Sequence, residues 1–289
     1  MLDGAPYTRL VEHMFTVIER GGPNAMDKTP CQLTTDVAAT VTPLRWTLTP
    51  ALTALLSEAE ADVVSFCRTL HVATGFFTRF ARTHFKAAGV SPDAVVQMAL
   101  HLAYRRRFGR FVATYETVVT TRFHHGRTET CRSATKEVRD FVLACIARAP
   151  AQQCTQLLRR AAQKHTSMLR HAAEGQGIDR HLLGLRIIAQ QKGIQPPLFS
   201  DPLFVQSSTW DLSTSQLFAP KSAAALGFRA TFEGCVGVQY QVYEDRIGLC
   251  ITTDRRCGAT NSDVFLQDVF DALAEIGPLL VPSGNSPKL

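Results

Sequence analysis

The chain of 289 residues has no apolar run that approaches the roughly 20 residues of a membrane-spanning helix. It also has no internal repeat and no long low-complexity tract, which excludes solenoid, fibrous and largely disordered proteins. Hydrophobic residues make up 45% of the sequence and charged residues 19%, as is typical of globular proteins. We therefore expect one large or two smaller globular domains and no transmembrane segment.

Metal-binding and secretory signatures are also missing. The eight cysteines include no Cys-x-x-Cys pair, so the sequence predicts no metal site and is consistent with buried thiols in a reducing compartment. Residues 1–6 lack the charged and apolar regions of a secretory signal. The last residues, Ser286-Pro287-Lys288-Leu289, are similar to a peroxisomal address of the Ser-Lys-Leu type, although Pro287 replaces the small residue. Without that address, the expected location is cytoplasmic.

Helical periodicity dominates the chain, and strand-like runs come late. Thr49-Pro50 and Ser91-Pro92-Asp93 each place an N-cap residue before a proline, which predicts helices that begin there. Helices are expected over residues 7–19, 51–70 and on to about 86, 91–107, 132–148, 151–174, 179–192 and 262–276. Strands are expected over residues 210–217, 236–243 and 247–253, with a hairpin turn at 244–246. This order favours an α/β fold, a two-layer mixed β-sheet with covering helices.

Two hydroxyl-rich clusters, residues 114–117 and 126–130, interrupt apolar surroundings. Their Tyr and Thr hydroxyls, together with a guanidinium, can surround a carboxylate. Arg180 is the candidate guanidinium, and the preceding Asp179 is suited to cap the helix that begins there. The same clusters could equally be a strand end and a loop that satisfy their own backbone.

The segment 213–216 reads Ser-Thr-Ser-Gln and is predicted to be part of a strand. Because side chains alternate along a strand, Ser213 and Ser215 share one face and Thr214 lies on the other. The two serine hydroxyls could donate to a negatively charged oxygen, or they could decorate an exposed strand edge.

Lys and Arg outnumber Asp and Glu by 31 − 25 = 6, which favours anionic partners in general. Arg82 and Lys86 share one helix face, where they could hold a phosphate or form a solvated surface pair. Residues 105–107 with Arg110 make a denser basic patch at a helix end, which complements the helix dipole without any ligand. The patch is the main support for nucleic-acid binding, but no aromatic platform or zinc finger accompanies it.

No histidine stands out as a general base. His181 stands beside two leucines, where a histidine is more often structural. The other histidines have no clear orienting carboxylate in the sequence: His13, His71, His84, His101, His124, His125, His165 and His171.

Taken together, several motifs resemble the carboxy-terminal portion of the choline/carnitine acyltransferase family. They are SPDAVVQMALHLAYRR (91–106), TYET (114–117), HGRTETCRSAT (125–135), DRHLLGL (179–185) and LSTSQ (212–216). The resemblance covers nearly the whole chain. It implies reversible acyl transfer between coenzyme A and the hydroxyl of carnitine, with a histidine general base and no tightly bound cofactor. It also implies small-molecule partners rather than nucleic acid, and a peroxisomal or mitochondrial location.

The resemblance assigns roles to residues on the carnitine side. Tyr115, Thr128 and Arg180 match the positions that hold the carnitine carboxylate, and Thr117 matches a further hydroxyl there. Choline has no carboxylate, and choline-specific relatives replace the Thr and the Arg, so carnitine is favoured. Ser215 matches the residue that stabilises the oxyanion of the tetrahedral intermediate, with Ser213 close by.

On the coenzyme A side, Arg82 and Lys86 match positions near the 3′-phosphate of coenzyme A. Asp93 matches a residue near the adenine, and Gln216 faces the coenzyme A side. Where the family has a Gly/Phe-Gly-Pro run, residues 223–229 begin with three alanines. Small side chains there predict room for medium or long acyl groups.

The family's catalytic histidine has no counterpart in the chain. Asp3-Gly4 and Glu12-His13 match the sequence just downstream of the family's Glu-His motif, so the base would fall immediately before Met1. His13 matches a different, non-catalytic histidine of the family and is a poor substitute.

The resemblance predicts two parts of the chain. Residues 1–43 would be the tail of a first domain and a linker, and residues 44–289 a second domain with the coenzyme A and carnitine contacts. The amino-terminal half of the enzyme would be missing, and the chain alone is expected to bind coenzyme A without transferase activity. The alternatives are a non-catalytic coenzyme A-binding or scaffolding relative and a basic RNA- or nucleotide-binding protein.

Overall fold

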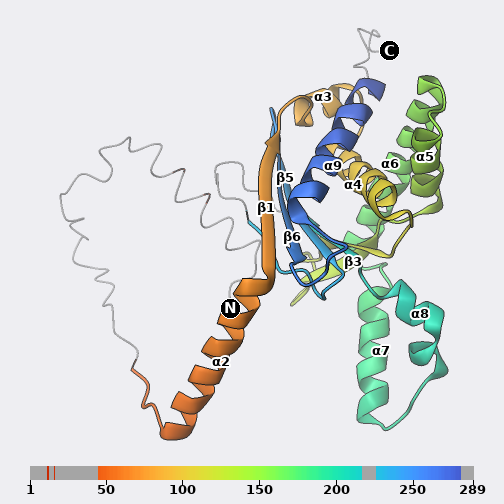
Figure 1. The fold of residues 1–289 in the computed structure, drawn as a ribbon. Helices are drawn as coiled ribbons and strands as arrows, with labels where there is room; N and C mark the ends of the chain where they lie inside the picture. The colour runs from red at the N-terminus through yellow and green to blue at the C-terminus, as the bar shows by residue number, and fades with distance from the viewer. Residues whose placement is uncertain (1–11, 13–15, 17–44, 217–225, 281–289) are drawn as a thin grey trace, which may run out of the picture. The chain divides into compact units, whose positions relative to one another are not determined.

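The computed structural model describes residues 12, 16, 45–216 and 226–280 (Figure 1). Most of the expected helix over residues 7–19, His13, the three alanines and the carboxy-terminal address lie outside the described residues. The described residues belong to two compact units, which divide after Leu70. The expected domain boundary at residue 43 stays a prediction.

Besides residues 12 and 16, the described part of the first unit is helix α2 (Pro50–Thr69) with the segment leading into it. Thr49 caps this helix, because its hydroxyl accepts from the Leu52 N–H at 3.2 Å, and Pro50 occupies the first helical position. The predicted helix start is therefore confirmed.

The second unit is built on a six-stranded mixed sheet. Its strands, in spatial order, are β1 (Leu70–Phe77), β6 (Ile247–Asp254), β5 (Val236–Val242), β4 (Leu212–Gln216), β2 (Thr114–Val119) and β3 (Thr128–Arg132). Strand β4 pairs in parallel with both β2 and β5, whereas β2–β3 and β5–β6 are antiparallel. The Tyr243 N–H donates to the Arg246 carbonyl at 2.9 Å, which confirms the hairpin turn.

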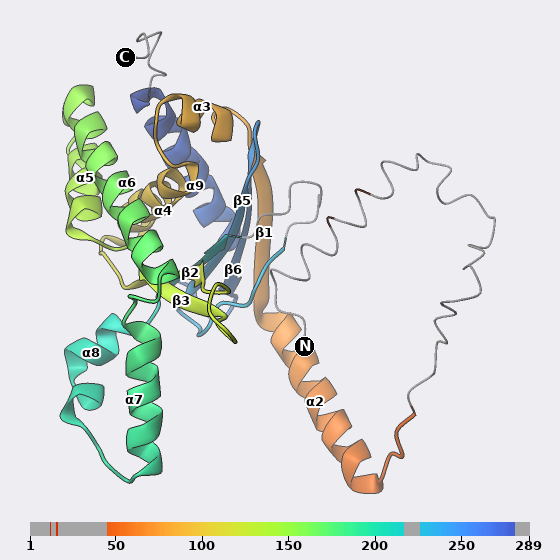
Figure 2. The same cartoon turned by 180° about the vertical axis from the view of Figure 1, so that it is seen from behind.

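Helices cover one face of this sheet, which confirms the predicted α/β class (Figures 1 and 2). They are α3 (Arg82–Ala87), α4 (Pro92–Phe108), α5 (Lys136–Ile146), α6 (Ala151–Ala173) and α9 (Ser262–Ile276). Helix α4 is the centre of the core, since every residue from Ala94 to Tyr104 is buried. Its start is confirmed by the Ser91 hydroxyl, which accepts from the Ala94 N–H. Its end follows from Gly109, whose φ of 70° lies in the left-handed region that favours glycine.

The chain between β3 and β4 contains α5 and α6 and then a helical arm. The arm consists of α7 (Asp179–Gln191), the 3₁₀ turn η3 (Pro197–Ser200) and α8 (Pro202–Ser207). A further 3₁₀ turn, η4 (Gly277–Leu279), follows α9. The arm matters for function because α7 begins next to the strands that carry the candidate binding residues.

Two expected boundaries were wrong. Residues 70–77 were expected to continue a helix, but they form strand β1. Val72, Thr74 and the two phenylalanines at the strand end favour an extended backbone, and pairing beside β6 stabilises it. The helix expected over 132–148 begins only at Lys136, where the Thr135 hydroxyl caps it, because Arg132 still belongs to β3.

Candidate functional site

The structure brings together the three residues expected to bind a carboxylate. Tyr115 lies on β2, Thr128 begins β3, and Arg180 lies in the first turn of α7. The Arg180 Nη2 donates to the Tyr115 hydroxyl at 3.2 Å and to the Thr128 hydroxyl at 3.1 Å. Its Nε donates to the Thr128 carbonyl at 3.0 Å. These neutral partners orient the guanidinium without cancelling its charge.

Asp179, the acid that precedes Arg180 in the sequence, pairs with a different arginine, Arg132. Arg132 forms a two-pronged ion pair with Asp179, at 2.7 and 3.0 Å, and donates to the Ser207 carbonyl at 2.6 Å. The Arg132 guanidinium also lies 4.7 Å from the centroid of the Trp210 ring. Asp179 therefore does not cap α7 as expected, and its side chain makes no cap hydrogen bond. Sequence reasoning missed Arg132, although it lies within the HGRTETCRSAT motif.

Among the ion pairs of the described residues, none involves the Arg180 guanidinium. The Glu129 carboxylate accepts from the backbone N–H of Arg180 at 3.3 Å, and from the Thr130 N–H at 2.6 Å. Arg180 is exposed, so its free N–H groups remain accessible to a ligand. A cation surrounded by hydroxyl groups is suited to bind a carboxylate.

The predicted serine residues lie on the same face of the sheet as Tyr115. Strand β4 pairs with β2 so that Ser213 is opposite Tyr115. Thr214 points to the other face, where it contacts α4, which confirms the predicted alternation. Ser213 is buried, and Ser215 is half-buried. Thr117 and Gln216 are half-buried on the same two strands.

The predicted coenzyme A residues surround the beginning of α4. Arg82 and Lys86 lie on α3, where Lys86 is exposed and the Arg82 Nε lies 3.6 Å from the Glu244 carboxylate. The Asp93 carboxylate accepts from the buried Tyr240 hydroxyl at 2.6 Å. The structure therefore places Asp93 against the core as well as at the helix start.

A groove of about 640 Å³ lies beside this helix start. It is lined by the turn between α3 and α4 and by residues of α6, most of them polar: Gly89, Val90, Ser91, Arg159, Ala162, Gln163, Thr166, Ser167 and Arg170. The Arg159 guanidinium is fixed by donating to the Ala88 carbonyl at 2.9 Å. The two arginines make the groove suited to anions, and sequence reasoning did not identify its α6 wall.

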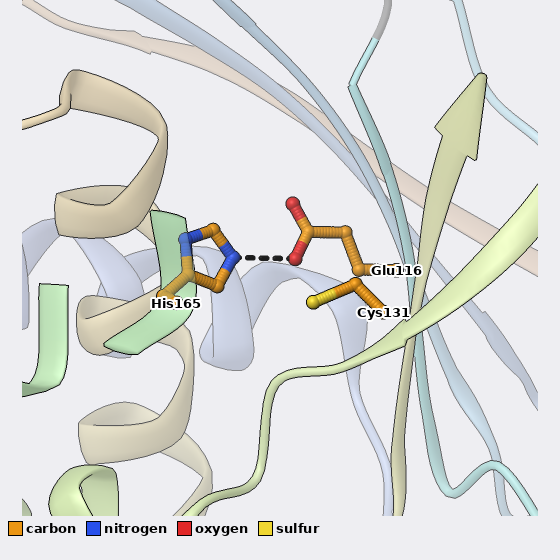
Figure 3. Close-up of side chains that lie close together, drawn as sticks. All are labelled: Glu116, Cys131 and His165. Atoms are coloured by element: carbon orange, nitrogen blue, oxygen red, sulfur yellow. Dashed lines mark hydrogen bonds and ion pairs between the residues drawn. The ribbon is translucent and has the colours of Figure 1, made fainter. Parts of the chain in front are cut away.

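A buried ion pair lies on the opposite face of β2 from Tyr115, Thr128 and Arg180, which we name the carboxylate cluster because they are expected to bind a carboxylate (Figure 3). The His165 Nε2 on α6 and the Glu116 Oε2 on β2 are 2.6 Å apart, and their side chains are 0% and 2% exposed. Burial raises the pKa of Glu116 to about 7, although His165 opposes the shift. Burial lowers the pKa of His165, but the Glu116 charge and hydrogen bond outweigh it, so that pKa is raised. The expectation that no histidine has an orienting carboxylate is therefore wrong for His165.

Cys131 lies beside this pair, so three potential metal ligands lie within 4.8 Å of one another (Figure 3). Two atoms that both bind a zinc ion at about 2.0–2.1 Å in tetrahedral geometry are roughly 3.3 Å apart. The 2.6 Å between Glu116 and His165 instead fits a shared proton. Burial also raises the pKa of the Cys131 thiol, which disfavours the thiolate that a metal needs. The hydrogen-bonded pair is the better interpretation of this cluster.

His71 also has a carboxylate partner, because its Nε2 lies 2.9 Å from the Asp263 Oδ2. Its Nδ1 faces the Ser262 N–H at 3.4 Å, at the start of α9. These contacts join β1 to α9, far in sequence from the candidate binding residues, so His71 has a structural role in the described residues.

The basic patch at the end of α4 is largely neutralised by acids. Three of its arginines form ion pairs of 2.8, 2.6 and 2.9 Å: Arg106 with Glu275, Arg107 with Asp268, and Arg110 with Asp211. Arg105 lies over the Phe111 ring, 5.6 Å from its centroid. The carboxylates next to three of the four arginines would repel a nucleic-acid backbone. These ion pairs account for the basic patch as part of the folded structure, without a nucleic-acid ligand.

Comparison with known proteins identifies the family. The sequence profile described as "Choline/Carnitine o-acyltransferase" matches residues 1–271. The chain therefore belongs to the choline/carnitine acyltransferase family, as its motifs predicted. Within the described residues, no helix has the length and apolar character required to cross a membrane.

Individual relatives are carnitine acyltransferases of several kinds. The human mitochondrial carnitine O-palmitoyltransferase 2 is 36% identical over 251 residues, which cover 83% of this chain and 38% of the relative. The rat carnitine O-acetyltransferase is 32% identical, covering 82% and 38%. The mouse peroxisomal carnitine O-octanoyltransferase is 35% identical, covering 78% and 37%. The chain thus spans well under half the length of these relatives.

Among solved structures, the chain is similar to one described as "PapA2 acyl transferase". The TM-score is 0.45 at 14% sequence identity, and the match covers 96% of this chain and 63% of that one.

Proposed function

We propose that this chain forms part of a carnitine O-acyltransferase, which transfers acyl groups reversibly between acyl-coenzyme A and carnitine. The observation that carries the proposal is Arg180, an exposed guanidinium with no carboxylate partner among the described ion pairs. Its guanidinium contacts are two hydroxyl groups and a carbonyl. Family membership supports the same function, because relatives named for three acyl groups all act on carnitine.

Carnitine fits this cluster through its carboxylate. The Arg180 guanidinium supplies charge, and the Tyr115 and Thr128 hydroxyls can each turn a proton toward a carboxylate oxygen. Hydrogen bonds to charged groups contribute about 1.5–3 kcal/mol each. Choline, which lacks the carboxylate, would leave the guanidinium unpaired, so the cluster selects carnitine.

In the proposed reaction, the carnitine hydroxyl oxygen attacks the thioester carbonyl of acyl-coenzyme A, and a general base accepts the hydroxyl proton. The tetrahedral intermediate then expels the coenzyme A thiolate, which takes up that proton. Ser215 would donate to the oxyanion, with Ser213 beside it on the same strand face. The base would be a histidine that we expect the amino-terminal half of the enzyme to supply, so we expect no transfer by this chain alone.

Coenzyme A would occupy the groove beside α4. Its phosphates are suited to the arginines that line the groove and to Arg82 and Lys86 on the preceding helix. Asp93 and Gln216 would contact the same substrate. The names of the relatives support a peroxisomal or mitochondrial location.

Isothermal titration calorimetry on the full chain tests the carnitine site. The wild-type chain should bind carnitine and not choline. Arg180→Gln should weaken carnitine binding by about 1.5–3 kcal/mol and leave coenzyme A binding intact. Lys192→Gln, which removes an exposed cation just after the same helix, is the matched control. Unchanged carnitine affinity in Arg180→Gln would overturn the assignment.

The coenzyme A site is tested in the same instrument. The Arg82→Ala/Lys86→Ala variant should weaken coenzyme A binding and spare carnitine. Arg186→Ala/Lys192→Ala removes the same charge from α7 and from the residue that follows it, and serves as the control. Equal affinity of both double variants for coenzyme A would count against the site on α3.

A further inference from the structure

A continuous line of buried hydrogen bonds connects the helix layer with the sheet. We name it the buried chain, and its members are Gln97, His101, Ser133, Thr214 and Tyr240. All five are at most 3% exposed, and Gln97, Thr214 and Tyr240 are fully buried. Buried polar groups are costly unless they are satisfied, so this line needs an explanation beyond packing.

Gln97 is the branch point of the buried chain. Its Nε2 donates one proton to the Thr214 hydroxyl at 2.9 Å and the other to the Tyr240 hydroxyl at 3.0 Å. Its Oε1 accepts from the Ser133 hydroxyl at 3.0 Å. Both amide protons and the oxygen are used, which fixes the orientation of the amide.

The far end of the buried chain sets the direction of these bonds. The His101 Nε2 lies 3.1 Å from the Ser133 hydroxyl. Because that hydroxyl gives its proton to Gln97, the imidazole must be the donor. Burial lowers the pKa of His101 to about 3, so the donor is the neutral imidazole with a proton on Nε2.

The two branches end at residues of the two proposed substrate sites. The Thr214 hydroxyl donates to the backbone carbonyl of Tyr115 at 2.8 Å. The Tyr240 hydroxyl donates to the Asp93 carboxylate at 2.6 Å. One side-chain amide therefore fixes β2 at the carnitine side and the start of α4 at the coenzyme A side.

We propose that Gln97 is a positioning residue that aligns the carnitine and coenzyme A sites with each other. The inference rests on the proposed function. Thr214 lies between the two serines of β4, so its bond to Tyr115 also fixes those serines relative to the carboxylate cluster. Gln97 touches no substrate and acts through Thr214 and Tyr240.

The test uses the full chain and two variants of the buried chain. Gln97→Leu keeps the volume but leaves the Thr214 and Tyr240 hydroxyls without their donor. Gln97→Leu/Thr214→Val also removes one stranded hydroxyl, which should restore part of the lost stability. Gln241→Leu is the control, because Gln241 is similarly buried at 5% exposure but, as the residue after Tyr240 on β5, faces the other side of the sheet.

Calorimetry then separates positioning from stability. Gln97→Leu should weaken binding of both carnitine and coenzyme A by about tenfold or more, as small displacements of binding groups do. The double variant should regain stability but not affinity, and Gln241→Leu should lose stability but keep both affinities. Recovery of both affinities together with stability in the double variant, or wild-type affinity in Gln97→Leu, would overturn the proposal.

A second readout does not depend on either substrate. Amide hydrogen exchange should become faster at β2 and β4 in Gln97→Leu, relative to α9 in the same molecule, and should not in Gln241→Leu. If the wild-type chain binds neither carnitine nor coenzyme A, the proposed function fails by itself. Unaltered exchange at β2 and β4 would then independently refute the positioning role of Gln97.

Discussion

The two faces of strand β2 treat charge in opposite ways. On the helix-facing side, Glu116 is closed off by His165 at 2.6 Å, and neither side chain is accessible. On the other side, Tyr115 holds the Arg180 guanidinium through a hydroxyl, and that guanidinium has no acid partner among the described ion pairs. In the proposed function, consecutive residues of one strand thus serve stability and recognition. A buried charge must be paired within the fold, whereas a binding site keeps its charge for the ligand.

The largest expected effect comes from breaking the buried Glu116–His165 pair on the helix-facing side of β2. Glu116→Leu would leave His165 buried without its partner and should lower the free energy of unfolding by about 3–5 kcal/mol. Glu116→Leu/His165→Leu should recover much of that loss, because no unpaired polar group remains. Urea unfolding at pH 7 measures both. If Glu116→Leu is as stable as wild type, the pair does not stabilise the folded protein as proposed.

The next effect compares the paired and the unpaired guanidinium. Arg180→Gln should reduce carnitine affinity by about 1.5–3 kcal/mol and change the free energy of unfolding by less than about 0.5 kcal/mol. Arg132→Gln should instead lower the free energy of unfolding by more than Arg180→Gln does, because it breaks the ion pair with Asp179 and the bond to the Ser207 carbonyl. Calorimetry and urea unfolding on both variants decide. Equal stability losses in the two variants would remove the distinction.

A smaller effect is the pH dependence of stability that arises from His101, which is buried on the helix-facing side of the sheet. The unfolded chain protonates His101 below its ordinary pKa of 6.5, whereas the folded protein keeps it neutral down to about 3. Wild-type stability contributed by His101 is therefore lost as the pH falls below 6.5. His101→Gln retains an N–H donor but does not titrate, so the wild type should lose about 2 kcal/mol relative to it between pH 8 and pH 5.

Urea unfolding of wild type and His101→Gln at both pH values gives this difference. The comparison cancels the titration of Glu116 and His165, which both proteins share. A difference that does not change with pH would show that His101 is accessible to protons in the folded protein.

The smallest effect is expected where charges are paired on the surface. Arg107→Ala removes the ion pair with Asp268 and should cost less than about 1 kcal/mol of unfolding free energy. The same variant should not change binding to a labelled oligonucleotide, which is expected to be negligible at physiological salt. Tight, steeply salt-dependent oligonucleotide binding that Arg107→Ala weakens would revive the nucleic-acid alternative.

Local signals predicted the elements that end in recognisable caps and turns. Thr49, Ser91 and the 244–246 turn behave as expected because their chemistry acts within a few residues. Strand β1 was missed because no helix breaker separates residue 69 from residue 70, so only pairing beside β6 reveals it. Such pairing is a long-range property that periodicity does not report.

The candidate site shows the same division. The motifs led to Tyr115, Thr128 and Arg180, and the structure places them in contact. The Glu116–His165 pair was missed because its members are 49 residues apart on a strand and a helix. Glu116 follows Tyr115 on β2 and therefore faces the opposite side of the sheet. What it meets there follows only from the packing of α6 against β2.

The parallel pairing of β2 with β4 also has a consequence for how the protein folds. The bond from the Thr214 hydroxyl to the Tyr115 carbonyl joins residues 99 positions apart in the chain. Closing so long a loop costs entropy before any contact compensates for it, and high contact order slows folding. Strands β2 and β4 should therefore join late, after α5 and α6 have formed. A nascent or partly folded chain would hold its helices but could not yet recognise a substrate.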